Sequence, residues 1–219
     1  MALNELLGTD HERVATTQIL PACVAEVEGR TLTMIDIAEL FRKFEASPLH
    51  LLSDLPNETG IYWLADHDGK RRYVGITDRL GFLQRINKYH CAGDETNSHK
   101  FSCNYNVGRM YRGPKDRGFD ALKAKKLRSC FIRKHCSAAC LPIIAPKEEL
   151  ERVERQIIAL AQPDTVAWNH SRNRLATFEE PTELVDQLIA ELGWSDVDRL
   201  AVDRQSRFSA RAKHLKSNE

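Results

Sequence analysis

Two short segments rich in strand-forming residues lie on either side of residue 68, with a tight-turn dipeptide between them. Residues 60–65 (Gly-Ile-Tyr-Trp-Leu-Ala) and 71–77 (Arg-Arg-Tyr-Val-Gly-Ile-Thr) contain the β-branched and aromatic residues that favour strands. Asp68-Gly69 between them is a frequent turn sequence of short hairpin loops. The pattern predicts an antiparallel β-hairpin, which limits the fold to classes that contain an antiparallel sheet.

Helical patterns flank this hairpin on both sides. Apolar residues recur at helical spacing over 34–45, where Thr33 is suited to cap the helix, and over 150–161, where Pro146 opens the helix. The other expectations are a strand at 17–25, a helix at 80–90, turns or a short helix near 99–109, an exposed loop at 107–119, a short helix at 121–126, strands at 127–133 and 140–145, an extended segment at 166–169, a helix at 182–192 and a last helix after Ser195. We therefore expect an α/β protein of the α+β kind, with a small central antiparallel sheet, flanking helices and helical N- and C-terminal extensions.

The composition is that of an ordinary globular protein, because 42% of the 219 residues are hydrophobic and 29% are charged. This excludes collagen-like and low-complexity chains. No apolar run approaches the ~20 residues of a membrane span, and the first ten residues lack the order of a signal peptide. We expect a cytoplasmic protein with a core domain at 58–170, an N-terminal extension at 1–57 and a C-terminal helical extension at 171–219.

The formal net charge of +1 conceals an uneven distribution. Residues 70–134 hold 17 Lys and Arg against 5 Asp and Glu, whereas 1–69 hold 4 against 12 and 135–219 hold 11 against 14. A basic block of this density suggests a nucleic-acid partner, although its charges would also fit a solvated face that pairs with the acidic flanks. Its insertion at about 100–135 interleaves aromatic residues, which suits phosphate contacts and base stacking. The candidate nucleic-acid contacts are Lys88, Lys100, Arg109, Arg112, Lys123, Lys125, Lys126 and Arg128.

Three of the six cysteines lie within residues 130–140, beside a histidine. No Cys-x-x-Cys pair occurs, and the spacings match no standard zinc finger or ribbon. Disulfides are not expected without a signal peptide. We expect reduced and partly buried thiols, with a zinc site as the alternative.

The candidate catalytic residues are dispersed along the chain. Gly60-Ile61-Tyr62 lies on the first expected strand and Tyr73-Val74-Gly75 on the second; Arg85, His90, His99, Glu154 and Asn169 follow in that order. The order resembles that of the GIY-YIG nuclease superfamily, over about residues 58–170. Each tripeptide alone is a short match, so the resemblance depends on the whole series.

The resemblance implies one active site that hydrolyses phosphodiester bonds. In such a site Tyr62 lies near the nucleophilic water, and Tyr73 orients or deprotonates it. Tyr62, Tyr73 and a histidine are all candidates for the general base. Arg85 carries a planar guanidinium that suits a non-bridging phosphate oxygen. Asn169 would brace the site through hydrogen bonds.

Two assignments have alternatives. His90 follows Arg85 by five residues, which in a helix of 3.6 residues per turn rotates it away from the arginine, so His99 is favoured over His90. Glu154 is favoured over Glu151 as the metal ligand, because it has apolar neighbours and lies beyond the first turn of its helix. It also precedes the closing asparagine by a spacing like that of the homing-nuclease branch of the superfamily.

Together these features predict a metal-dependent DNA endonuclease that uses Mg²⁺, with Mn²⁺ as a substitute, held by Glu154. Restriction-type, single-strand-specific and structure-specific enzymes all fit the same residues. The alternative is a nucleic-acid-binding protein that keeps the nuclease scaffold without activity. The expected partner is single- or double-stranded DNA, and the recognition sequence, the strand preference and the oligomeric state stay open.

Overall fold

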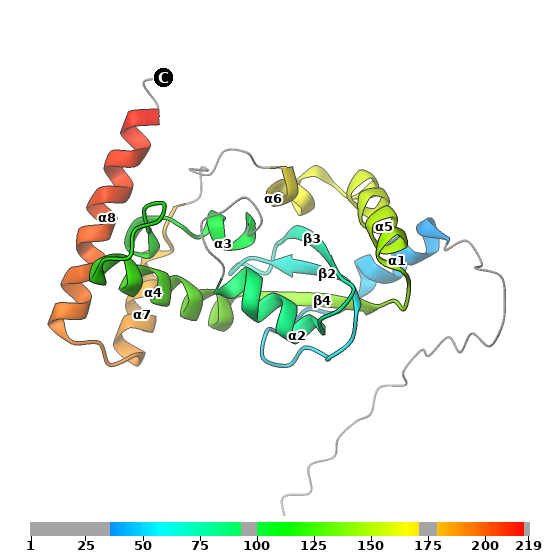
Figure 1. The fold of residues 1–219 in the computed structure, drawn as a ribbon, viewed down its shortest axis with the longest axis horizontal. Coiled ribbons are helices and arrows are strands. Elements are labelled where there is room, and N and C mark those ends of the chain that lie inside the picture. Colours follow the sequence, from blue (N-terminus) through cyan, green and yellow to red (C-terminus); the bar gives the residue numbers. More distant parts are fainter. Residues whose placement is uncertain (1–35, 93–99, 171–178, 217–219) are drawn as a thin grey trace, which may run out of the picture. The chain divides into compact units, whose positions relative to one another are not determined.

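The computed structural model describes residues 36–92, 100–170 and 179–216. It has the predicted α+β architecture, with a four-stranded antiparallel sheet in the order β1-β4-β2-β3 (Figure 1). The strands are β1 (His50–Leu51), β2 (Gly60–Ala65), β3 (Arg71–Thr77) and β4 (Ser137–Pro142). All six residues of the central strand β2 are buried, which makes this strand the floor of the site described below.

The predicted hairpin is confirmed by the pairing of β2 with β3. Tyr62 pairs with Gly75 and Leu64 with Tyr73, so the two tyrosines share one face of the sheet as diagonal neighbours. The turn between the strands is held by Asp66, whose carboxylate accepts the Asp68 and Lys70 N–H groups at 3.0 and 2.9 Å.

Steric constraints explain why both tripeptides contain glycine. Gly60 has φ +146°, and a Cβ there would collide with the backbone of β4 at Leu141. A Cβ at Gly75 would lie 2.5 Å from the Tyr62 hydroxyl oxygen. The Tyr62 ring therefore covers β3 at the one position where β3 has no side chain.

Helices cover the sheet and extend beyond it (Figure 1). Helices α1 and α5 pack together, and α5 also contacts β2 and β3. Helix α4 packs against the segment after α2 and against α8. The bounds are α1 (Ile37–Ala46), α2 (Phe82–Arg85), the π-helix η1 (Ile86–Cys91), α3 (Lys100–Asn104), the 3₁₀ helix η3 (Gly108–Met110), α4 (Phe119–His135), α5 (Lys147–Leu160), the 3₁₀ helix η4 (Pro163–Val166), α6 (Ala167–His170), α7 (Thr182–Glu191) and α8 (Asp196–Lys216).

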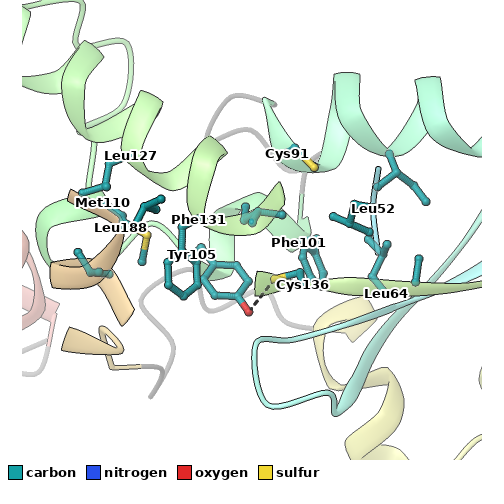
Figure 2. Packing of buried hydrophobic residues seen from close by; sticks show 14 of the residues in the cluster. Leu52, Leu64, Cys91, Phe101, Tyr105, Met110, Leu127, Phe131, Cys136 and Leu188 are labelled. Atoms are coloured by element: carbon teal, nitrogen blue, oxygen red, sulfur yellow. Dashed lines mark hydrogen bonds between the residues drawn. The ribbon is translucent and has the colours of Figure 1, made fainter. Parts of the chain in front are cut away.

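One hydrophobic cluster joins the sheet to the C-terminal helices, as Figure 2 shows. It runs from Leu64 on β2 through Tyr105 and Phe131 to Leu188 on α7. The Tyr105 hydroxyl also accepts the Cys136 thiol at 3.2 Å, so the cluster contains a satisfied polar pair. The C-terminal helices thus belong to the same core as the sheet.

Residues 36–57 were assigned from the sequence to an N-terminal extension. They contribute strand β1 and helix α1, which pack with the sheet. Strand β1 pairs with β4, and Phe44 of α1 stacks on Trp63 of β2 with ring centroids 4.9 Å apart. Helix α1 is capped by Asp36, whose Oδ1 accepts two N–H groups of the first turn. The expected strand at 17–25 and the expected cap at Thr33 lie outside the described residues.

Three local expectations are wrong. Residues 127–133 form part of the 17-residue helix α4 instead of a strand, since a short apolar run does not by itself distinguish a strand from a buried helical face. Residues 166–169 are helical instead of extended. The loop expected to be exposed at 107–119 is buried in its first part, at Val107, Met110 and Arg112.

No helix in the described ranges combines the length and the apolar character that crossing a membrane would require.

Candidate active site

Tyr62 and His90 form the buried centre of the candidate site. The Tyr62 hydroxyl and His90 Nε2 are 2.7 Å apart and share a hydrogen bond, and both residues are at most 1% exposed. Burial raises the pKa of Tyr62 to about 12, although the charge and hydrogen bonding of Arg85 act in the opposite direction. The Tyr73 ring lies 5.0 Å from the His90 ring, and burial together with Tyr62 and Glu154 raises the pKa of Tyr73 well above its usual range.

A π-helical turn brings His90 to this position. Residues 86–91 wind as η1, in which each backbone hydrogen bond spans five residues instead of four. This wider turn returns a residue at i+5 to the side of residue i, so Arg85 and His90 both interact with Tyr62. The α-helical geometry assumed in favouring His99 over His90 is therefore wrong for this segment. His99 lies outside the described residues.

Arg85 provides the positive charge beside the tyrosines. Burial lowers its pKa, but interactions with Tyr62 and Tyr73 outweigh burial and raise it. Its guanidinium also stacks over Tyr89, 4.6 Å from the ring centroid. Arg85 Nε is buried and has no hydrogen-bond partner among the residues that the structure describes. The Arg85 residue as a whole is half-buried, so another part of its guanidinium is accessible to an anionic oxygen.

Glu154 on α5 provides the carboxylate of the candidate site, on a helix that contacts β2 and β3. Burial raises the pKa of its carboxyl to about 6, Glu151 raises it further, and Arg85 and Lys100 lower it. Glu154 acts in turn on the pKa values of Tyr62 and Tyr73, which places it against the hairpin. The favoured metal ligand and the favoured phosphate ligand thus both act on the same tyrosine pair, and Arg85 also acts on Glu154.

Asn169 fixes helix α6 to strand β3. Its Oδ1 accepts the Val74 N–H and its Nδ2 donates to the Val74 carbonyl, both at 2.8 Å, and the side chain is buried. Lys100 of α3 donates to the Asn169 carbonyl and so lies inside the candidate site. The sequence predicted Lys100 only as a nucleic-acid contact, because no spacing pattern connects it with a residue 69 positions later.

The oxygen ligand that the site offers fits a hard divalent cation that keeps most of its water ligands. Mg²⁺ binds proteins through one or two carboxylates and completes its coordination with water and substrate phosphates, which a single Glu154 allows. No group of three or more His, Cys, Asp or Glu that could hold a metal occurs within the described parts of the chain. The five described cysteines are free thiols.

Four of the predicted nucleic-acid contacts are buried or paired with acidic residues of the protein. Arg128 is 1% exposed and donates to Asn106 Oδ1 and, at 3.2 Å, to the Met110 carbonyl; Arg112 is also buried. Arg109 and Lys123 form ion pairs with acidic residues of the C-terminal helical part. The prediction is wrong for Arg112 and Arg128, which burial keeps from a nucleic acid. Lys88 and Lys126 are exposed, and Lys125 is half-buried.

The site is assembled from β2, β3, α2, η1, α3, α5 and α6, and it combines a hydroxyl–imidazole pair, a guanidinium and a carboxylate. Proton transfer next to a cation and a metal-binding carboxylate is the chemistry that hydrolysis of a phosphodiester requires. Searches with this chain against protein-family models, curated proteins and solved structures each gave no match.

Proposed function

We propose that this protein is a DNA endonuclease that depends on Mg²⁺, or on Mn²⁺ in its place, and hydrolyses phosphodiester bonds at the Tyr62–His90 site. One observation carries the proposal. Side chains that are up to 92 positions apart in the sequence, from Tyr62 to Glu154, interact around one point on the sheet. The same residues carry the resemblance to the GIY-YIG nucleases.

The buried tyrosine and histidine suggest how the water is deprotonated. With a pKa of about 12, Tyr62 holds its own proton at neutral pH, so a standing phenolate is an unfavourable base. His90 Nε2 is 2.7 Å from that hydroxyl and can take its proton as the hydroxyl takes one from the water. Tyr62 then acts as a relay, and His90 is the final acceptor.

The two charged groups act on the phosphate. Arg85 is half-buried, and the accessible part of its guanidinium can donate to a non-bridging oxygen, where negative charge increases during attack. Glu154 would hold the metal ion, whose charge stabilises the leaving oxygen. Tyr73 and the Asn169 clamp keep the hairpin and α6 in position around the reacting atoms.

Cleavage assays with purified protein test this proposal. Labelled single- and double-stranded DNA are incubated with the full chain in Mg²⁺, Mn²⁺ or a chelator. We expect cleavage only with metal, and a loss of about 10²-fold or more in Tyr62→Phe and in His90→Gln. Glu154→Gln should lose cleavage and keep DNA binding, and Glu151→Gln, one turn earlier on α5, is the matched control that should keep both.

Two results would contradict the proposal. Cleavage within threefold of the parent in both Tyr62→Phe and His90→Gln would show that the site is elsewhere. DNA binding without cleavage in either metal would favour the alternative of an inactive binding protein on a nuclease scaffold.

A further inference from the structure

A groove with basic edges lies between the outer face of α4 and the end of η1. It has a volume of about 390 Å³ and is lined by Ala92, Leu122, Lys125, Lys126, Cys130 and Arg133, together with Ser129. This volume lies within the range of small-molecule pockets. Among the residues that the structure describes, the lining contains three cationic side chains and no carboxylate, so its charge suits an anion.

The groove has an apolar floor in addition to its cations. Leu122 is 51% exposed there, although it is a large hydrophobic residue, and Cys130 and Ala92 continue the apolar surface. Leu122, Lys126, Ser129 and Arg133 recur at helical spacing and form one continuous face of α4. A purely electrostatic contact with a phosphate backbone would not require this exposed floor.

Two hydrogen bonds hold Arg133 in place at the edge of the groove. Its Nη1 donates to Ser129 Oγ at 2.6 Å and its Nε to Asn87 Oδ1 of η1 at 3.2 Å. Burial raises the pKa of Cys91 to about 12, and the charge of Arg133 lowers it, so Arg133 also lies near Cys91. Two hydrogen bonds thus orient a planar guanidinium before any ligand binds.

The short helix η1 connects this groove with the candidate active site. It presents His90 to Tyr62 and, three residues earlier, presents Asn87 to Arg133. Helix α4 packs against η1, beside the end of α2 in Figure 1. Because η1 contributes a residue to both places, the groove neighbours the candidate site, and a DNA strand bound at one can extend to the other.

We propose that the groove binds one unpaired nucleotide of the DNA strand that is cut, with its base on the Leu122–Cys130 floor and its phosphates at Lys126 and Arg133. The inference rests on the proposed nuclease function and adds a substrate class to it, namely DNA that is single-stranded next to the cleavage site. A base can lie on an apolar floor only when it is unstacked and unpaired, whereas the cations alone would serve either form of DNA.

Binding assays in a chelator test the groove without cleavage. The probes are a labelled single-stranded oligonucleotide and the same sequence as a blunt duplex. Leu122→Ala should weaken binding of the single strand about tenfold and leave duplex binding within twofold, because it removes only the apolar floor. Leu160→Ala is the matched control, since Leu160 is 52% exposed on α5, away from the groove.

The cations are tested through the salt dependence of binding. The double variant Lys126→Ala/Arg133→Ala should reduce the slope of log K against log salt by about 1.4 for the single strand, at about 0.7 for each phosphate contact. Arg117→Ala, in the exposed part of the loop before α4, is the control and should change the slope by less than half as much.

The outcomes separate the groove from the proposed function. Equal losses on single strand and duplex, or losses as large in Leu160→Ala and Arg117→Ala, would overturn the groove proposal while cleavage at Tyr62 could still be normal. Selective loss of single-strand binding in a protein that cuts no DNA under any condition would support the groove and refute the nuclease.

Discussion

At the scale of the residue, Glu154 shows how the candidate site and the stability of the protein are in conflict. Burial raises the pKa of the Glu154 carboxyl from 4.5 to about 6, and the nearby charge of Glu151 raises it further. A raised carboxyl pKa means that the folded state disfavours the charged form. Above pH 6 the protein therefore carries a charge that costs folding free energy, and this is the form that a metal ion requires.

We predict that Glu154→Gln stabilises the protein near neutral pH. The shift corresponds to about 2 kcal/mol as an upper bound, because the carboxyl keeps some solvent contact. The folded parent takes up a proton between pH 6 and 4.5 that the unfolded chain does not, so its disadvantage disappears as the pH falls through this window. Urea unfolding of both proteins from pH 4.5 to 8, without metal, measures the difference in the free energy of unfolding.

Glu151→Gln is the control for this measurement. The Glu151 side chain is 42% exposed and its carboxylate is 3.5 Å from Lys147, so its own ion pair contributes no more than about 0.5 kcal/mol. Because its charge also raises the pKa of Glu154, Glu151→Gln should stabilise the protein at neutral pH by less than Glu154→Gln does. A Glu154→Gln protein that is no more stable than the parent at pH 7.5 would contradict the argument.

At the scale of the element, the π-helical turn is what assembles Arg85 and His90. An α-helix would bring residues four apart to one side, and η1 does so for residues five apart. The segment from Arg85 to His90 is therefore one residue longer than an α-helix would need to direct both side chains at Tyr62. Lys88 is the exposed residue of this turn, and its ammonium lies over the Tyr89 ring, 5.5 Å from the centroid.

We predict that deleting Lys88 preserves the site. Without this residue the segment can wind as an α-helix, with Arg85 and the histidine four apart and both still directed at Tyr62. The metal-dependent cleavage rate should stay within about tenfold of the parent, whereas His90→Ala should lose about 10²-fold or more. A deletion variant that folds, as judged by circular dichroism, and is as inactive as His90→Ala would show that the π-turn itself is required.

The elements differ in how far the sequence predicts them. The hairpin was predictable because its signals are local: strand-forming residues on both sides of Asp68-Gly69. Helix α4 was divided into a helix and a strand because its buried face depends on packing against η1 and α8. The π-turn has no signature in its residue types. Sequence order thus suggested Tyr62, Tyr73, Arg85 and Glu154 as one site, but not which histidine would complete it.

At the scale of the whole molecule, the basic middle third of the chain has two separate uses. Part of it is neutralised by acidic residues that come later in the sequence: Arg109 by Glu180 and Asp186, and Lys123 by Asp198. The other part, Lys126 and Arg133 among them, lines the groove. Counting charges in the sequence cannot distinguish the paired basic residues from those that line the groove, because the distinction depends on which helices pack together.

The last prediction concerns Arg109, which belongs to the neutralised part. Its side chain is 15% exposed; Nε donates to Glu180 at 2.6 Å, Nη1 to Asp186, and Nη2 to the Thr182 carbonyl at 3.3 Å. Arg109→Ala leaves the Glu180 carboxylate, 12% exposed, without its counter-charge, and should lower the free energy of unfolding by about 3 kcal/mol. Arg109→Lys keeps the charge without the planar fork and should lose less. Lys147→Ala, which breaks an exposed pair, should cost no more than about 0.5 kcal/mol in the same urea titration.

Because Arg109 already has its anions within the protein, Arg109→Lys should leave the salt dependence of DNA binding unchanged. A lower slope in that variant would show that Arg109 contacts DNA, which would contradict its assignment to the neutralised residues.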